Sequence, residues 1–299
     1  MRLTFRRTAF LSIAVAAACA PGPAPRASSS GVESAAQTVV PAETTAPAEI
    51  AEWQRLAGFL KSEDPATRFV EATTLFLRVP YHNGPLGEGD AGGPDPDPRF
   101  DLERADCVTY LEQSLALALA DPADPGSFLA ALDAVRYRDG EVSYVTRSHY
   151  MVRDWIPAND WLLEDVTAQV GAGHLESVER TIDRATFLRD NGAEPRPGVD
   201  DARDMAVEYI PSAALNEVAA ELRTGDLIFW IGNVEGIFVL HTGLVRVQAD
   251  GGLTFRHASS RARKALDESM AKYAARNGKM PGFLVLRIRP DAAMPPVRD

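Results

Sequence analysis

Two different apolar patterns follow each other along the chain, and their order limits the folds it can adopt. The first part carries apolar residues at helical spacing, over Trp53–Leu60, Pro65–Leu77, Asp106–Leu119 and Phe128–Val135. The later part carries short runs of strand-forming residues between Gly, Asn or Asp clusters, at Asp226–Ile231, Val239–Val245, Leu253–His257 and Phe283–Ile288. Helices first and strands later predict an α+β fold, with N-terminal helices packed on a mostly antiparallel β-sheet.

The N-terminus has the composition of an export signal. Arg2, Arg6 and Arg7 give it a basic start, and Ala9–Ala18 is apolar but too short to span a bilayer. Small residues directly before Cys19 resemble a bacterial lipobox, in which the cysteine is lipidated after cleavage. We therefore expect a signal peptide over 1–19 and an exported protein that is periplasmic or lipid-anchored through Cys19. An ordinary Ala-x-Ala cleavage site, with Cys19 unmodified, is the alternative.

Composition divides the rest of the chain in two. Residues 20–50 are rich in Ala, Pro, Ser and Thr and lack a hydrophobic period, which predicts a disordered linker. Residues 51–290 then form the predicted folded domain. The net charge of −11 argues against nucleic-acid binding, because phosphate backbones are bound by an excess of Lys and Arg.

Several common motifs are absent or out of context. Gly87–Gly92 matches G-x-G-x-x-G, but no strand precedes it and prolines follow where a helix should begin. Asp95 and Asp97 fit a solvated acidic turn better than a calcium loop. A zinc hydrolase would need closely spaced ligands such as His-Glu-x-x-His, and a serine hydrolase G-x-S-x-G; neither occurs. We therefore expect no metal and no cofactor.

Cys107 is the one cysteine of the predicted domain, and it stands at the start of a predicted helix. The positive end of a helix dipole favours thiolate over thiol, and thiolate is the nucleophilic form. Because the other cysteine, Cys19, falls in the export signal, no disulfide is expected in the mature domain. Cys107 is therefore a candidate for covalent catalysis.

A cysteine nucleophile needs an imidazole as its base and a third group that orients the imidazole. His241 follows Cys107 by 134 positions, which matches the separation in papain-type enzymes. His257 ends the next predicted strand, so adjacent antiparallel strands can bring the two rings together and fix the tautomer of His241. A histidine inside an apolar run such as Phe238–Val245 is also often a core residue, and that alternative stays open.

At this point the chain resembles the NlpC-type cell-wall cysteine peptidases, which have a papain-like fold. The matching pieces, in order, are Pro80-Tyr81, Asp106-Cys107, Thr224–Phe229, His241–Leu244 and His257–Ser260. Within that superfamily the chain is similar to the N-acetylmuramoyl-L-alanine amidase-like branch, through Cys107–Glu112, Arg136–Gly140, Ser148–Tyr150, Asp154-Trp155 and Asn159.

The resemblance implies Cys107 as nucleophile, His241 as general base and His257 as the orienting third residue. It implies that Tyr81 supports the nucleophile or the developing oxyanion. The branch-specific segment supplies candidate substrate contacts: His149, Tyr150, Asp154, Trp155 and Asn159. The alternative for this segment is structural, with Trp155 filling core volume and His149 capping a loop.

The implied activity is a hydrolase of peptidoglycan fragments (muropeptides) that cuts the amide between N-acetylmuramic acid and L-Ala through a thioester on Cys107. Two alternatives remain open. One is an endopeptidase that cuts between D-Glu and the diamino acid of the stem peptide. The other is a non-catalytic wall-binding lipoprotein. The membrane is expected as a partner only through the lipid anchor.

Overall fold

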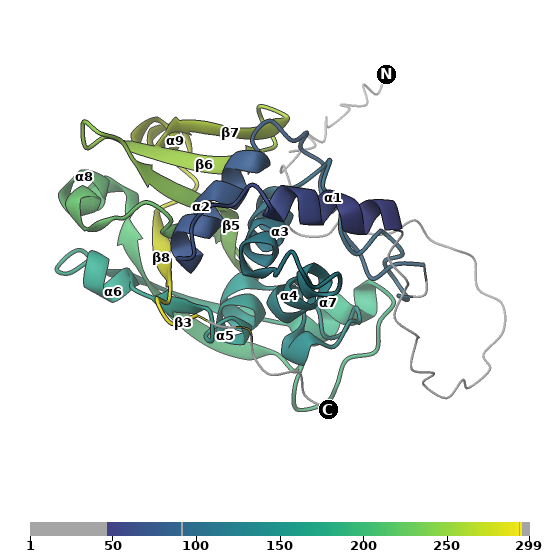
Figure 1. Cartoon of the computed structure of the whole chain (residues 1–299). Coiled ribbons are helices and arrows are strands. Elements are labelled where there is room, and N and C mark those ends of the chain that lie inside the picture. Colours follow the sequence, from purple (N-terminus) through teal and green to yellow (C-terminus); the bar gives the residue numbers. More distant parts are fainter. Residues whose placement is uncertain (1–46, 91, 293, 295–299) are drawn as a thin grey trace, which may run out of the picture.

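The longest helices precede the first strand, as the apolar pattern predicts. The computed structural model describes residues 47–90, 92–292 and 294 (Figure 1). In this part of the chain the helices are α1 (Pro47–Ala57), α2 (Pro65–Leu75), α3 (Cys107–Leu119), α4 (Ser127–Arg136), α5 (Ile156–Ala158), α6 (Thr167–Val170), α7 (Arg184–Asp190), α8 (Leu215–Val218) and α9 (Met270–Arg276). A single π-helical turn, η2 (Met151–Trp155), leads directly into α5.

The strands form one antiparallel sheet. They are β1 (Leu163–Asp165), β2 (Glu176–Ile182), β3 (Arg203–Pro211), β4 (Leu227–Val234), β5 (Ile237–Val247), β6 (Leu253–Ser259), β7 (Lys264–Ser269) and β8 (Gly282–Ile288). Their order is β2-β3-β8-β4-β5-β6-β7, and β1 pairs with β8. Every pairing is antiparallel, so the predicted α+β class and sheet type are confirmed.

Local sequence explains where α2 and α3 begin. The Asp64 side chain accepts a hydrogen bond from the Thr67 backbone N–H, and Pro65 takes the first helical position, where its missing N–H costs nothing. Asp106 caps α3 in the same way. Both helices therefore start where the sequence predicts them.

The sheet is covered on both faces. Leu227, Phe229 and Ile231 of β4 belong to a core shared with α1 to α4, whereas Ile228 and Trp230 belong to a second core shared with α8 and α9. Alternate residues of a strand point to opposite faces, so a strand buried on both sides reads as a continuous apolar run. In Figure 1, α3 lies at the centre beside β5, and α9 lies by β6 and β7.

Four strands, β1, β2, β3 and β7, were not predicted, and α1 begins earlier than expected. β1 has only three residues, and β2, β3 and β7 mix exposed charged residues with buried ones; β2 and β7 also form the two edges of the sheet. They therefore lack the apolar run that marks β4 or β8. The first helix starts at Pro47, inside the segment 20–50 that was predicted as linker.

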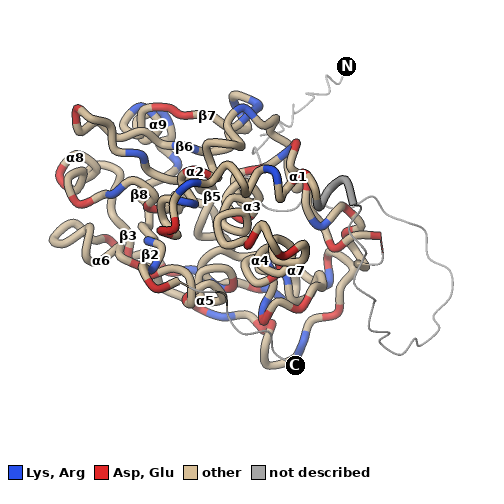
Figure 2. The backbone as a smooth tube through the Cα atoms, in the orientation of Figure 1, with Lys and Arg blue, Asp and Glu red and all other residues tan. Residues whose placement is uncertain are grey.

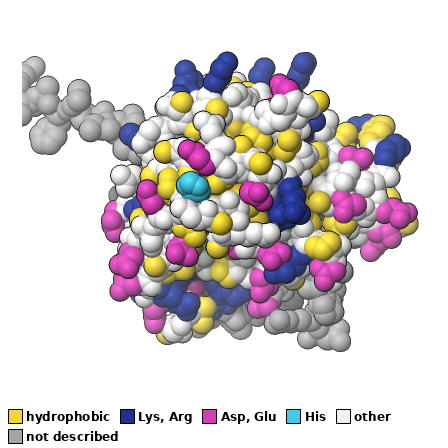
Figure 3. Space-filling view, turned by 90° about the vertical axis from the view of Figure 1, so that its left-hand side faces the viewer, with side chains coloured by type: hydrophobic (Ala, Val, Ile, Leu, Met, Phe, Trp, Pro, Cys, Tyr) yellow, Lys and Arg dark blue, Asp and Glu magenta, His cyan; other side chains and the backbone are white. Residues whose placement is uncertain are grey.

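The predicted export signal, Cys19 and residues 20–46 of the linker lie outside the described residues. Within residues 47–90, 92–292 and 294, no helix is both long and apolar enough to cross a membrane. Acidic and basic residues are interspersed along the chain (Figure 2). On the face shown in Figure 3, hydrophobic side chains also alternate with charged ones of both signs.

Candidate active site

Cys107 is the first residue of α3, directly after its cap. Asp106 Oδ1 accepts hydrogen bonds from the backbone N–H of Val108 (3.0 Å) and Thr109 (2.8 Å), and Thr109 Oγ1 accepts from the Asp106 N–H in return (2.9 Å). The other Asp106 oxygen accepts from the Gly84 N–H, which ties the preceding loop to the cap. This reciprocal cap fixes the position of Cys107 at the positive end of the 13-residue helix.

Cys107 is fully buried and disulfide-bonded in the structure. The one other cysteine of the sequence, Cys19, lies outside the described residues, so the expectation of no disulfide within the domain itself stays a prediction. A sulfur in a disulfide is not a nucleophile, so any chemistry at Cys107 begins with its reduction to the thiol.

Thr242 joins β5 to the start of α3. Its hydroxyl donates to the backbone carbonyl of Cys107 at 2.9 Å. Sequence reasoning missed this residue, although its place directly after His241 makes it part of the matched segment. The bond places the strand that carries His241 against the N-terminus of the helix that carries Cys107.

The side chains of the two predicted catalytic histidines are in hydrogen-bond contact. His241 Nε2 and His257 Nδ1 are 2.6 Å apart, and the rings are perpendicular. The ladder between β5 and β6 runs from Val247–Leu253 to Leu244–Arg256 and ends there. The pair therefore lies just past the point where the two strands stop pairing.

The histidine rings and the Thr242 hydroxyl leave the sheet on opposite sides. His241 is opposite Trp230 and Thr242 is opposite Phe229 in the β4–β5 ladder, and those two partners belong to different cores. The His241 ring stacks on Tyr273 of α9 at 5.7 Å. The histidine pair therefore lies on the α9 side of the sheet, whereas Thr242 and the start of α3 lie on the other side.

Both histidines are held neutral. Burial lowers the pKa of His241 well below its usual value, and His257 adds to this effect. Burial also lowers the pKa of His257, against the opposing influence of Glu268, which accepts a hydrogen bond from His257 Nε2 at 2.8 Å. Sequence reasoning missed Glu268, because its position depends on the register between β6 and β7.

Tyr81 lies beside the nucleophile segment. Its backbone forms a parallel bridge with Ala105, two residues before Cys107. Burial raises the pKa of Tyr81 to about 12, and the negative charge of Asp106 adds to the increase. The phenol therefore keeps its proton at neutral pH and is able to donate a hydrogen bond.

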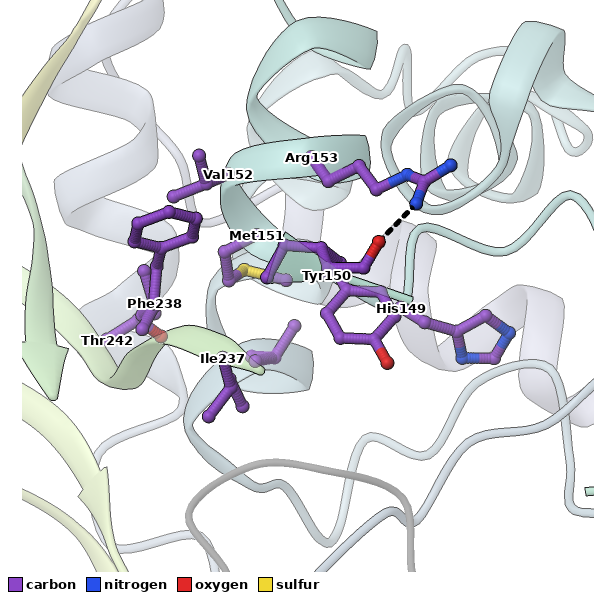
Figure 4. Close-up of a pocket in the computed structure, with 11 residues that line it drawn as sticks. His149, Tyr150, Met151, Val152, Arg153, Ile237, Phe238 and Thr242 are labelled. Carbon is purple, nitrogen blue, oxygen red and sulfur yellow. Dashed lines mark hydrogen bonds between the residues drawn. The ribbon is translucent and has the colours of Figure 1, made fainter. Parts of the chain in front are cut away.

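A pocket opens beside Val108 and Thr242. Figure 4 shows Tyr150, Met151 and Ile237 close together in its wall, with Arg153 bonded to a backbone carbonyl. The other lining residues are Val108, His149, Val152, Ile182, Phe238, Val239 and Thr242. Of the five predicted substrate contacts, His149 and Tyr150 thus line this pocket.

The other three predicted substrate contacts form hydrogen bonds with other residues of the protein. Trp155 Nε1 donates to buried Glu112 at 3.1 Å, and Asn159 Nδ2 donates to two backbone carbonyls at 2.9 Å. Asp154 accepts from the Arg184 guanidinium at 2.6 Å. His149 Nε2 lies 2.7 Å from the Tyr144 carbonyl, so it also holds its own loop together.

Comparison with known proteins gives the family. The family model for N-acetylmuramoyl-L-alanine amidase-like proteins (AmiA-like) matches residues 71–280. Among solved structures, the Legionella pneumophila protein LPG0564 has 23% identity and a TM-score of 0.72, covering 83% of this chain and 96% of its own.

Two structures from Bacteroides match at a similar level. An N-acetylmuramoyl-L-alanine amidase from Bacteroides uniformis has 25% identity and a TM-score of 0.61, covering 74% of this chain and 98% of its own. A putative xylanase from Bacteroides fragilis has 26% identity and a TM-score of 0.60, covering 73% and 99%. No curated protein matches the chain. The chain belongs to the N-acetylmuramoyl-L-alanine amidase-like family.

Proposed function

We propose that this protein is an exported cysteine hydrolase that cuts the amide between N-acetylmuramic acid and L-Ala in muropeptides. The observation that carries the proposal is the hydrogen-bonded histidine pair, in which His241 directly precedes the Thr242 that bonds the start of α3, within the segment that matches the amidase-like family. Cys107, His241 and His257 all lie inside residues 71–280.

In the proposed mechanism, the His241 ring turns from the α9 side of the sheet towards α3 and meets the reduced thiol of Cys107. His241 takes the thiol proton, and the thiolate attacks the lactyl carbonyl of the muramic acid. The tetrahedral oxyanion receives hydrogen bonds from the Cys107 backbone N–H and the Tyr81 hydroxyl. When the C–N bond breaks, His241 returns the proton to the amine of L-Ala, which leaves with the stem peptide.

The second half of the reaction releases the sugar. A thioester now joins the lactyl group to Cys107. His241 accepts a proton from water, the resulting hydroxide attacks the thioester, and the Cys107 thiolate leaves. The products are N-acetylmuramic acid with a free carboxylate and an intact stem peptide. We assign Tyr150 and His149, in the wall of the small pocket beside Val108, to the edge of the substrate site.

Mass spectrometry of muropeptide digests tests this function. The full-length protein, with and without reductant, is incubated with N-acetylmuramyl peptides, and Cys107→Ser serves as the matched control. Free stem peptide and free N-acetylmuramic acid, formed only by reduced wild type, are the expected products. Release of the diamino acid would instead identify an endopeptidase. Binding without any cleavage would identify a wall-binding protein.

Export and anchoring are a separate proposal. Arg2, Arg6 and Arg7, the apolar stretch that follows and the position of Cys19 support a lipid-anchored protein on the periplasmic side of a membrane. We expect the wild-type protein to be found in the membrane fraction of the cell and Cys19→Ser in the soluble exported fraction. Equal distribution of the two proteins would contradict a lipid anchor at Cys19.

A further inference from the structure

The histidine pair is the inner part of a longer chain of contacts. His257 Nε2 lies 2.8 Å from Glu268 Oε1, on the far side of its ring from His241. The Arg276 guanidinium of α9 hydrogen-bonds both oxygens of Glu268. His241, His257, Glu268 and Arg276 thus come from β5, β6, β7 and α9 in succession.

Glu268 carries a negative charge in this chain. Burial of its carboxyl raises the pKa, but the hydrogen bonds from Arg276 and His257 outweigh that effect and lower the pKa of Glu268 to about 2. An ionised carboxylate can only accept hydrogen bonds. The proton of the His257–Glu268 contact therefore resides on His257 Nε2.

The position of that proton determines the other tautomers. Because neutral His257 carries its proton on Nε2, its Nδ1 has a lone pair and accepts. The 2.6 Å contact then requires His241 to donate from Nε2. His241 Nδ1 is left without a proton, and it is the nitrogen that a general base needs.

The other groups around the pair do not compete for this role. Tyr273 packs its ring against both imidazoles, and its hydroxyl points to the Met280 sulfur. Asp267, next to Glu268 on β7, pairs instead with Arg256 and Arg246. Among the described residues, Glu268 is the carboxylate that hydrogen-bonds the histidine pair.

We propose that Glu268, held in place by Arg276, is a positioning residue that sets the tautomer of His257 and, through it, leaves Nδ1 of His241 as the base. The inference rests on the proposed cysteine hydrolase for its catalytic meaning. The tautomers themselves can be measured without any activity, so the two proposals can fail separately.

Histidine ¹⁵N NMR on the reduced full-length protein is the direct test. We expect wild-type His241 to be protonated on Nε2 alone, with resonances assigned from His241→Gln and His257→Gln. Glu268→Gln removes the charge and keeps the size, and the amide can donate as well as accept. We therefore expect Nδ1-protonated His241 to become visible. Identical tautomers in wild type and Glu268→Gln would overturn the inference.

Two further variants complete the test. Glu176→Gln on β2 is the matched control: its carboxylate also accepts a hydrogen bond from a ring-bearing side chain, Tyr209, but at the opposite edge of the sheet. It should leave the tautomers unchanged. Arg276→Gln releases Glu268 without removing its charge and should give a smaller effect. If Glu268→Gln does not fold, an unchanged tautomer in Arg276→Gln would count against the inference.

Activity adds a second readout. With muropeptide as substrate, Glu268→Gln should lower kcat about tenfold and change KM less than about twofold, because the base loses orientation and the pocket is untouched. Loss of the negative charge should also move the acid limb of the kcat/KM profile to lower pH. A uniform loss of activity at every pH, with no movement of that limb, would contradict a positioning role.

Discussion

Trp155 shows how one hydrogen bond decides between a structural and a substrate-binding role. Its indole donates to Glu112, whose other oxygen binds Arg136, and all three side chains are buried. Trp155→Phe leaves one Glu112 oxygen unpaired, which costs about 1–3 kcal/mol in unfolding free energy. We expect this loss in urea unfolding experiments, with kcat/KM within about twofold of wild type.

The contrasting variant is Tyr150→Ala. Tyr150 is half-buried and lines the pocket beside Val108, so its removal should raise KM with little change in the free energy of unfolding. If Trp155→Phe instead raised KM and left the free energy of unfolding unchanged, Trp155 would be a substrate contact after all.

The two histidines differ in the size of their expected effects. His241 transfers the proton in the proposed mechanism, so His241→Ala should lower kcat by roughly 10²–10⁴-fold. His257 only orients His241, so His257→Ala should lower it less, and the double variant should resemble His241→Ala because the residues act as a unit. Steady-state kinetics on muropeptide compares the three. A larger loss in His257→Ala would reverse the two roles.

Local chemistry explains which site residues the sequence could reveal. Cys107 after Asp106, and the two histidines on successive strands, are recognisable from neighbours and spacing alone. Trp155 and Asn159 lie in the same matched segment as Tyr150, yet only packing shows that their side chains turn inward. Glu268 has no local signal, since its contact with His257 depends on how two strands align.

At the scale of elements, the cap of α3 links helix stability to the site. Asp106→Ala removes the acceptor for two backbone N–H groups and the anchor of the Gly84 loop, which costs about 1 kcal/mol or more. It also loosens the segment that carries Cys107. We expect Asp106→Ala to lower both the free energy of unfolding and kcat/KM. Asp106→Asn, which keeps an acceptor oxygen, should recover most of both.

Asp64 provides a matched control on another helix. It caps α2 through the Thr67 N–H and hydroxyl, away from Cys107 in the sequence. Asp64→Ala should cost a similar free energy of unfolding, about 1 kcal/mol, and leave kcat/KM unchanged. If both variants lose activity equally, the effect of Asp106→Ala reflects general destabilisation and the cap has no special role at the site.

Elements also differ in how well the sequence predicts them. The sequence predicts β4 as a strand because both faces of β4 are buried and its residues form a continuous apolar run. It predicts the starts of α2 and α3 because Asp64 and Asp106 are recognisable capping residues. The edge strands β2 and β7 gain most of their order from one neighbouring strand each. Their charged, half-exposed sequences are also compatible with loops, so tertiary pairing decides their structure.

At the scale of the whole molecule, buried neutral histidines make folding depend on pH. Burial lowers the pKa of His149, and nearby Arg147 and Arg184 lower it further; His241 and His257 are also lowered. Each binds a proton more readily in the unfolded chain, whose histidines titrate near 6.5. Stability is therefore fully present above that pH and declines as pH falls towards the folded pKa values.

Urea unfolding between pH 7.5 and 5.5 measures this dependence, and His149→Gln isolates one contribution. Glutamine retains a donor for the Tyr144 carbonyl but does not titrate, so the variant should lose less stability on acidification, by up to about 1.4 kcal/mol per pH unit. The carboxylates are common to both proteins and cancel in the difference. Parallel curves for wild type and His149→Gln would mean that His149 accepts its proton inside the folded domain.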